Sequence, residues 1–159
     1  MTEEISANRG RFSMKVNCQW QEGLAFTAQL GRHSVRMDTR PPLGQDSGPS
    51  PKQLLLAAIA GCTAMDVVSL LRKHKQPLES LTVDTEADVT SGQPAVFQEV
   101  KLRFRIVGKV DREQAISAVE LSQSKYCGVS AMVSKVSPLT YVIEINEEEV
   151  YRGHANFGL

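Results

Sequence analysis

The sequence predicts an α+β fold with antiparallel sheets, and three observations favour it. Residues 81–90 and 97–107 alternate apolar and polar residues as half-buried strands do, and a Ser-Gly-Gln-Pro turn separates them. The long apolar stretch 51–75 is typical of a buried helix. The chain has 159 residues, of which 42% are hydrophobic and 23% charged, as in a soluble globular protein with one core.

The charge balance and the cysteine content indicate which binding partners and which cellular compartment to expect. Eighteen Lys and Arg residues balance eighteen Asp and Glu residues, so the basic surface that a nucleic-acid partner selects is absent. The polar start contains no apolar signal-peptide core, and we therefore expect a cytoplasmic protein. Three widely spaced cysteines, Cys18, Cys62 and Cys127, fit a reducing compartment better than a disulfide scaffold.

The expected organisation is one domain between two polar ends. Residues 1–12 are expected to form a flexible terminus, 13–146 a single domain and 147–159 a tail. Before the helix, strand-like runs are predicted at 14–20, 24–30 and 33–37. A loop rich in Pro, Gly and Ser follows over 39–51, and Pro51 could be the first residue of the helix, with Ser50 as its N-cap. After the long hairpin, we expect helices at 112–124 and 128–136, and a last strand at 140–145.

The apolar segment 54–71 is nearly as long as the ~20 residues that a membrane-spanning helix requires. Asp66 interrupts this stretch and a basic segment follows it directly, so we interpret it as a core helix and expect no membrane association. Pro77 ends the helix. Because it is apolar on nearly every side, the few other elements cannot cover it, and an intertwined dimer would supply the missing cover.

Motifs for nucleotides and metals are missing from the sequence. No phosphate-binding glycine loop and no Cys-x-x-Cys occurs, and His33, His74 and His154 are scattered without the spacing of metal ligands. We therefore expect no cofactor and no metal. A Ser–His–Asp arrangement stays open on spacing alone, although no nucleophile elbow is present.

Each cysteine has two interpretations. Cys62, in the run AAIAGCTAMD, is either a small core residue or a thiol beside residues small enough to let a ligand approach. Cys127, in KYCGVSAM, is either a capping or core residue or a thiol at a helix start, where free amide groups favour the thiolate. Cys18, near Trp20 in a strand, is expected to serve packing.

Together, the runs GPSPKQLLLAAIAGCTAMDVVSLL and KYCGVSAM resemble the OsmC/Ohr superfamily of thiol-dependent peroxidases, most closely its short OsmC-like subgroup. The resemblance covers about residues 15–145. It implies an OsmC-like fold, in which antiparallel sheets wrap around central helices in an intertwined, domain-swapped homodimer. Two active sites would then lie at the subunit interface.

The resemblance also implies roles for single residues. Cys62 matches the peroxidatic cysteine and Cys127 the resolving cysteine. Arg40, in DTRPPLG, resembles the arginine that holds the thiolate, although it could equally be a solvated loop residue. Lys52 stands where the family has the glutamate that pairs with this arginine. Asp66 could substitute for that glutamate, or it could be a buried carboxylate paired with some Arg or Lys.

The implied activity is reduction of organic hydroperoxides in oxidative-stress defence. Cys62 would attack the peroxide, Cys127 would form a disulfide with the resulting sulfenic acid, and an external dithiol would reopen it, with no cofactor. Met65 and Met132 would favour an organic peroxide over hydrogen peroxide. The alternative is a dimer whose dithiol site binds a small apolar or thiol ligand without efficient turnover. A purely structural dimer would require both cysteines to be inert.

Overall fold

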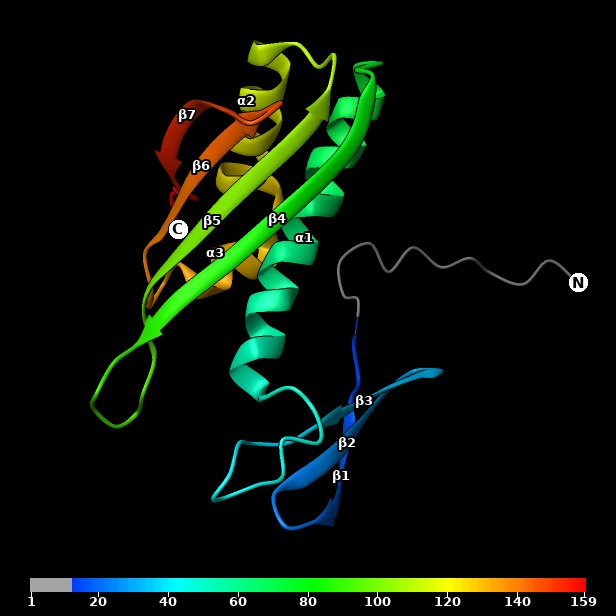
Figure 1. Cartoon of the computed structure of the whole chain (residues 1–159), viewed down its shortest axis with the longest axis vertical. Coiled ribbons are helices and arrows are strands. Elements are labelled where there is room, and N and C mark those ends of the chain that lie inside the picture. Colours follow the sequence, from blue (N-terminus) through cyan, green and yellow to red (C-terminus); the bar gives the residue numbers. More distant parts are fainter. Residues whose placement is uncertain (1–12) are drawn as a thin grey trace, which may run out of the picture. The chain divides into compact units, whose positions relative to one another are not determined.

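The structure is a computed structural model that describes residues 13–159. The chain divides at Pro51 into two compact units, the second of which is Lys52–Leu159. Figure 1 shows the elements of both units. The flexible segment predicted for 1–12 lies outside the described residues. The sequence predicted a single domain over 13–146 and no boundary at this proline.

The first unit contains an antiparallel sheet in the order β1-β2-β3. Its strands are β1 (Asn17–Glu22), β2 (Ala25–Leu30) and β3 (His33–Met37), close to the predicted ranges. Gly23 and Gly31 have positive φ in the two tight turns, a conformation that glycine adopts without steric cost. The three predicted strands of this region are therefore confirmed, although β1 begins at Asn17 and ends at Glu22.

Strand β1 exposes all six of its residues. Cys18 is exposed, and the Trp20 side chain is 64% exposed, with its indole N–H donating to the Gly23 carbonyl (3.0 Å). The packing role expected for Cys18 is therefore wrong within the described chain. The physical reason is that a strand buries one face only where a second layer covers it, and the described part of this unit holds no helix.

Asp38 organises the predicted Pro- and Gly-rich loop, and it is 4% exposed. Its carboxylate accepts hydrogen bonds from the backbone N–H groups of Thr39 (2.7 Å), Gln45 (3.2 Å) and Ser47 (3.0 Å), and from the Ser47 hydroxyl (2.7 Å). These bonds, the Ser47 hydroxyl first among them, hold the pKa of Asp38 well below its usual value. A Cβ at Gly44 would lie 2.3 Å from the Thr39 carbonyl oxygen, so this tight loop requires glycine there.

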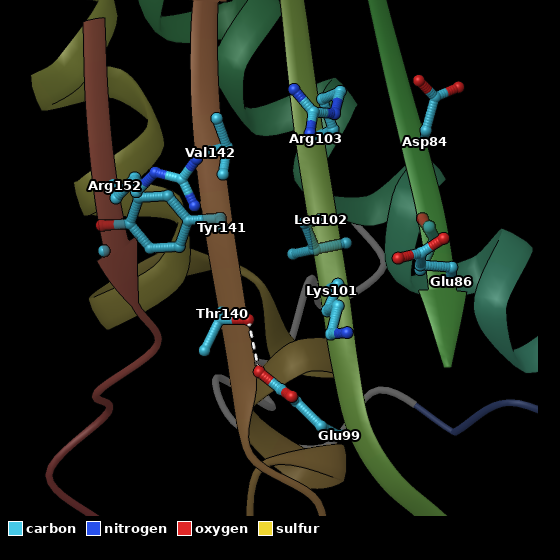
Figure 2. A pocket seen from close by; sticks show the side chains of 12 residues that line it. Asp84, Glu86, Glu99, Lys101, Leu102, Arg103, Thr140, Tyr141, Val142 and Arg152 are labelled. Carbon is cyan, nitrogen blue, oxygen red and sulfur yellow. Dashed lines mark hydrogen bonds between the residues drawn. The ribbon is translucent and has the colours of Figure 1, made fainter. Parts of the chain in front are cut away.

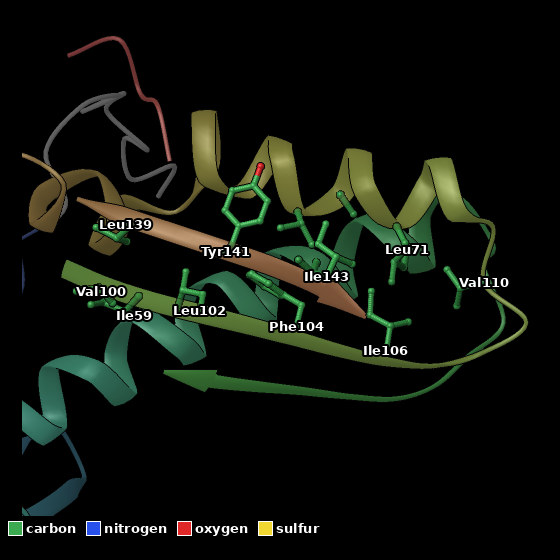
Figure 3. Close-up of a cluster of buried hydrophobic side chains, with 14 of the residues drawn as sticks. Ile59, Leu71, Val100, Leu102, Phe104, Ile106, Val110, Leu139, Tyr141 and Ile143 are labelled. Atoms are coloured by element: carbon green, nitrogen blue, oxygen red, sulfur yellow. The ribbon is translucent and has the colours of Figure 1, made fainter. Parts of the chain in front are cut away.

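The second unit packs its helices on one face of a four-stranded sheet in the order β4-β5-β6-β7 (Figures 1 and 3). The strands are β4 (Leu78–Val89), β5 (Phe97–Gly108), β6 (Leu139–Ile145) and β7 (Glu148–His154). The helical elements are α1 (Pro51–Lys73), α2 (Arg112–Leu121), the π-helical turn η1 (Ser122–Tyr126) and α3 (Gly128–Val133). The predicted order of helices and strands is thus confirmed up to β6.

The core of this unit lies between the sheet and the helices. Alternate residues of β5 and β6 point into it, among them Leu102, Phe104 and Ile143, each at most 2% exposed (Figure 3). The α2 helix begins where the sequence predicted, because the Asp111 carboxylate accepts a hydrogen bond from Gln114 N–H (3.0 Å) as an N-cap.

One strand pair departs from the predicted antiparallel sheets. β5 and β6 run parallel, with Val100 opposite Leu139 and Ile106 opposite Ile145, while the other neighbours are antiparallel. The cause is the connection, because α2, η1 and α3 carry the chain back along the sheet before β6 begins. A crossover of this kind returns a strand in the same direction as its predecessor.

The predicted tail over 147–159 is also corrected. Residues 148–154 form β7, which pairs with β6 at the edge of the sheet. Asn146 and Glu147 make the connecting turn with positive φ, and the Asn146 side chain bonds both the N–H (3.0 Å) and the carbonyl (2.9 Å) of Gly108. Val150 and Tyr151 pack against the core. The acidic run Glu147–Glu149 concealed this strand, because glutamate is poorly represented in strands.

Helix α1 buries a single stripe within the chain. Ile59, Thr63, Val67 and Leu71 are its buried residues, at the four-residue spacing of one helix face. The expected burial on every side is therefore not reached within one chain. By length and composition alone α1 could cross a membrane, although only 22% of its most apolar window is buried here. One such helix is weak evidence for a span, since core helices of soluble proteins pass the same test.

Candidate active site

The fold brings Cys62 and Cys127 together across 65 positions of sequence. Cys62 lies in the middle of α1, and Cys127 is the residue between η1 and α3. Their sulfur atoms lie within 4.8 Å of each other and of a carboxylate oxygen of Asp66. Both thiols are free. A Cβ added at Gly61 would meet nothing within 4 Å, so the backbone next to Cys62 is open to an approaching molecule.

Cys127 is a buried thiol at the N-cap of α3. Its sulfur accepts a hydrogen bond from the backbone N–H of Ser130 (3.4 Å). Burial is the main cause that raises the pKa of Cys127 to about 11, while the bonds from Ser130 oppose the increase and the nearby Cys62 adds to it. The helix start was predicted correctly, and Cys127 is both a capping and a buried residue, in which burial outweighs the amide group that would favour the thiolate.

Asp66 lies one helical turn after Cys62 and faces η1. The Ser122 hydroxyl donates to its carboxylate at 2.9 Å. None of the ion pairs found among residues 13–159 involves Asp66. Of the two interpretations of Asp66, the structure therefore supports a place beside the thiols rather than a pairing with Arg or Lys.

A buried polar network behind the thiol pair was missed by sequence reasoning. Thr63, Ser122, Gln123 and Ser130 are each at most 1% exposed. The Thr63 and Ser122 hydroxyls lie 2.7 Å apart, and the Gln123 amide donates to Thr63 (2.9 Å) and to Ser130 (3.2 Å). Gln123 Oε1 has no partner. The sequence offered one signal for this network, the polar run Ser-Gln-Ser at 122–124 shortly before Cys127. This run resembles the polar end of an amphipathic helix.

Ser122 and Gln123 continue the buried face of α2 into η1. Ser122 and Gln123 are buried, whereas Ser124 and Lys125 in the same turn are exposed. The two buried side chains follow the buried residues Ala115, Ala118 and Val119 at the spacing of one helix face, and π-helical turns such as η1 are frequent at functional sites. Sequence reasoning missed them because both side chains are polar, whereas a buried helix face is recognised by apolar residues.

Cys62, Cys127 and Asp66 are also the group in the described chain that could hold a metal ion. Two sulfurs and one carboxylate match the donor types of a zinc site with an open position. The raised pKa of Cys127 opposes this use, because a metal binds the thiolate. The predicted absence of a metal remains a prediction.

Arg40 and Lys52 are both exposed within the chain. Arg40 is exposed in the loop after β3, where its carbonyl accepts from Gly44 N–H (3.2 Å), and Lys52 is exposed in the first turn of α1. Arg40 lies in the first unit and the thiol pair in the second. The grouping of Arg40 with Cys62 therefore stays a prediction. Met65 and Met132, the predicted apolar surroundings, are 75% and 70% exposed within the chain.

A large surface groove lies elsewhere, on the outer face of the sheet (Figure 2). It has a volume of about 770 Å³ and is lined by charged side chains such as Glu86, Lys101 and Arg152. Many of its polar groups are already paired, as in the bond from Thr140 to Glu99 (2.8 Å) and the ion pair of Arg103 with Glu144. Strand alternation places Lys101 on the face opposite the core. The residues that line this groove include neither of the site cysteines nor Asp66.

Comparison with known proteins decides the family. The family described as OsmC-like protein matches residues 44–142, which include α1, both site cysteines and Asp66. The chain belongs to the OsmC-like protein family. It is 33% identical over 134 residues to the protein YhfA of Escherichia coli strain K12, covering 83% of this chain and 98% of YhfA.

Solved structures agree with the OsmC-like fold. A hypothetical protein from Aquifex aeolicus VF5 is 25% identical and superposes with a TM-score of 0.78, covering 86% of this chain and 98% of that protein. An organic hydroperoxide resistance protein from Elizabethkingia anophelis superposes with a TM-score of 0.69 over 87% of this chain and 99% of its own, at 17% identity. At that identity the likeness shows the fold alone.

Proposed function

We propose that this OsmC-like protein is a thiol-dependent peroxidase that reduces organic hydroperoxides. The observation that carries the proposal is the placement of two free thiols, Cys62 and Cys127, within 4.8 Å of each other by separate elements. Solved proteins of the same fold are named organic hydroperoxide resistance proteins, which supports this substrate class.

Cys62 is the peroxidatic residue in this proposal, because it is partly exposed while Cys127 is buried. The Cys62 thiolate attacks one peroxide oxygen, an S–O bond forms, and the O–O bond breaks. The alkoxide leaves, takes up a proton and becomes an alcohol. The peroxide is reduced by two electrons and Cys62 is oxidised to a sulfenic acid.

Cys127 then resolves this intermediate. Its sulfur attacks the Cys62 sulfur, an S–S bond forms, and the S–O bond breaks with release of water. An external dithiol reopens the disulfide by thiol–disulfide exchange, so the cycle needs neither metal nor organic cofactor. The disulfide protects Cys62 from the higher oxidation states that cannot be reversed.

Arg40 and the second subunit complete the proposed site. Arg40 favours the thiolate of Cys62 and orients the peroxide, as the family resemblance implies. The protein is a homodimer, and the face of α1 opposite the buried stripe supports this, because Met65 on that face is 75% exposed. A second copy would cover that face. We place the protein in the cytoplasm, where dithiol reductants are available and three free cysteines are expected.

An alternative function fits the same dithiol site. Lys52 removes the carboxylate that the family pairs with its arginine, and a weakly held arginine would slow peroxide turnover. The protein would then bind a small apolar or thiol ligand beside Gly61, where the backbone is open.

A thiol titration separates the two functions. The reduced protein is mixed with one equivalent of cumene hydroperoxide, and free thiols are counted before and after. We expect loss of two thiols and a Cys62–Cys127 bond. Cys62→Ser should abolish peroxide consumption, whereas Cys127→Ser should consume the one equivalent and stop at the Cys62 sulfenic acid, which a second equivalent would over-oxidise. The matched control Cys18→Ser should behave as the parent protein does. Parental rates in both Cys62→Ser and Cys127→Ser would exclude the peroxidase and favour ligand binding.

A further inference from the structure

The hydrogen bonds beside the thiol pair can be oriented in only one way, and the last of them is donated to the Asp66 carboxylate. Ser122 uses its only hydroxyl proton for the Asp66 carboxylate (2.9 Å), so the short contact between Ser122 and Thr63 (2.7 Å) takes its proton from Thr63. Thr63 in turn accepts from the Gln123 amide (2.9 Å). With Asp66 as a carboxylate, which can only accept, this is the one assignment of donors and acceptors in which each of the three hydrogen bonds has its own proton. Donors therefore run from Gln123 through two hydroxyls to Asp66.

Gln123 also connects this chain of donors to the second thiol. Its other amide proton goes to the Ser130 hydroxyl (3.2 Å), and the Ser130 backbone N–H donates to the Cys127 sulfur (3.4 Å). One buried side chain thus positions both Asp66 and the turn that holds Cys127. The main chain of Gln123 is held as well, because its carbonyl accepts from Asn156 N–H (3.0 Å).

The chemistry of the proposed cycle needs a base at this place. Burial keeps Cys127 a thiol at neutral pH, since its pKa is raised to about 11. A thiol is a poor nucleophile, so Cys127 must lose its proton as it attacks Cys62. The Asp66 carboxylate lies within 4.8 Å of both sulfurs, a distance that one bridging water closes.

We propose that Asp66 is the general base of the resolving step, held in place by the Gln123–Thr63–Ser122 donor chain. This role rests on the proposed dithiol function. Asp66 takes the proton from the Cys127 thiol, and the sulfur attacks Cys62. The S–S bond forms as the S–O bond of the sulfenic acid breaks. The departing hydroxide takes the proton back from Asp66 and leaves as water.

The test separates the first oxidation from the resolving step. Reduced parent and Asp66→Asn proteins are mixed with tert-butyl hydroperoxide, and mass spectrometry follows dimedone-trapped sulfenic acid on Cys62 and the disulfide. We expect Asp66→Asn to form sulfenic acid at the parental rate and the disulfide on the order of 100-fold more slowly. Asp66→Glu should restore most of the rate. Asp84→Asn, a carboxylate on the outer face of the sheet, is the matched control and should change neither step.

A second oxidant keeps this test independent of the peroxidase proposal. Diamide forms an adduct with the Cys62 sulfur, and Cys127 must still lose a proton to displace the hydrazine and form the disulfide. If the parent reacts with diamide but not with hydroperoxide, the peroxidase proposal fails. The role of Asp66 is then still tested by comparing the rates at which the parent and Asp66→Asn form the disulfide with diamide. A parental rate of disulfide formation in Asp66→Asn with diamide overturns the role of Asp66.

A third variant covers the case in which Asp66→Asn does not fold. Ser122→Ala keeps the carboxylate and removes only the hydroxyl that orients it. We expect the resolving step to slow about tenfold, with sulfenic acid formation unchanged. If a folded Ser122→Ala protein formed the disulfide at the parental rate, the proposal that the Gln123–Thr63–Ser122 donor chain holds Asp66 in place would be wrong.

Discussion

At the scale of single residues, the two site cysteines differ in their surroundings, and this difference supports the proposed order in which they react. Cys62 is partly exposed on α1 beside the open backbone of Gly61. Cys127 is fully buried, and burial favours its neutral thiol. An exposed sulfur meets a dissolved oxidant first, and a buried neutral thiol is protected until the first sulfur has been oxidised.

The buried thiol predicts a pH dependence of stability. In the folded protein the pKa of Cys127 is about 11, above its ordinary value of 9.0, so the thiol stabilises the fold below pH 9. That contribution is lost as the pH rises from 9 to 11. In urea unfolding under reducing conditions, the parent should exceed Cys127→Ala in stability at pH 8, and the difference should shrink towards pH 11. A difference that stays constant over this range would contradict a buried neutral thiol.

At the scale of elements, the loop between β3 and α1 is ordered by one carboxylate. Asp38 draws together residues up to nine positions away by accepting four hydrogen bonds, and Gly44 and Gly48 lie where the backbone passes too close for a Cβ. Since this loop carries Arg40, Asp38 determines the backbone conformation from which the proposed peroxide-orienting residue extends.

Replacing this carboxylate should loosen the loop. Asp38→Asn loses the charged acceptor, and we expect backbone amides of 39–47 to exchange with deuterium at least about fivefold faster at pH 6. Because the pKa of Asp38 is lowered in the fold, its contribution is present above its ordinary value of 3.8 and is lost as the pH falls further. The difference from the parent should therefore narrow between pH 5 and pH 2.

The matched control for this loop is Asp46→Asn. Asp46 is exposed in the same loop at a positive φ that asparagine tolerates, and its backbone bond to Thr39 does not use the side chain. It should exchange as the parent does. Equal exchange in Asp38→Asn and Asp46→Asn would show that the carboxylate of Asp38 does not order the loop.

At the scale of the whole molecule, local signals were readable from the sequence and long-range ones were not. The start of α1 at Pro51, the N-cap of α2 at Asp111 and the strand alternation of β5 each depend on a few neighbouring residues, and the elements predicted at these places are present. The parallel pairing of β5 with β6 depends on where the crossover returns the chain. The bond between Thr63 and Ser122 joins residues 59 positions apart, so no local pattern contains it.

The thiol pair shows the same limit at the candidate site. The family motifs identified Cys62 and Cys127 as partners, and the fold brings their sulfurs within 4.8 Å. Gln123 was not predicted, because a polar side chain on the buried face of a helix is recognised only when its hydrogen-bond partners on other elements are known.

The exposed face of α1 leads to the last prediction, which concerns assembly. A helix of 23 residues that buries one stripe and leaves Leu55 and Met65 exposed has more apolar surface than a chain in water should show. We expect a dimer by sedimentation at micromolar concentration. Met65→Lys should shift it towards monomer, because a charge on this face loses its water when the face is covered. Val89→Lys, an exposed apolar position on β4, is the matched control and should leave the dimer intact. A folded parent that sediments as a monomer would contradict the intertwined dimer, and the site would then have to function within one chain.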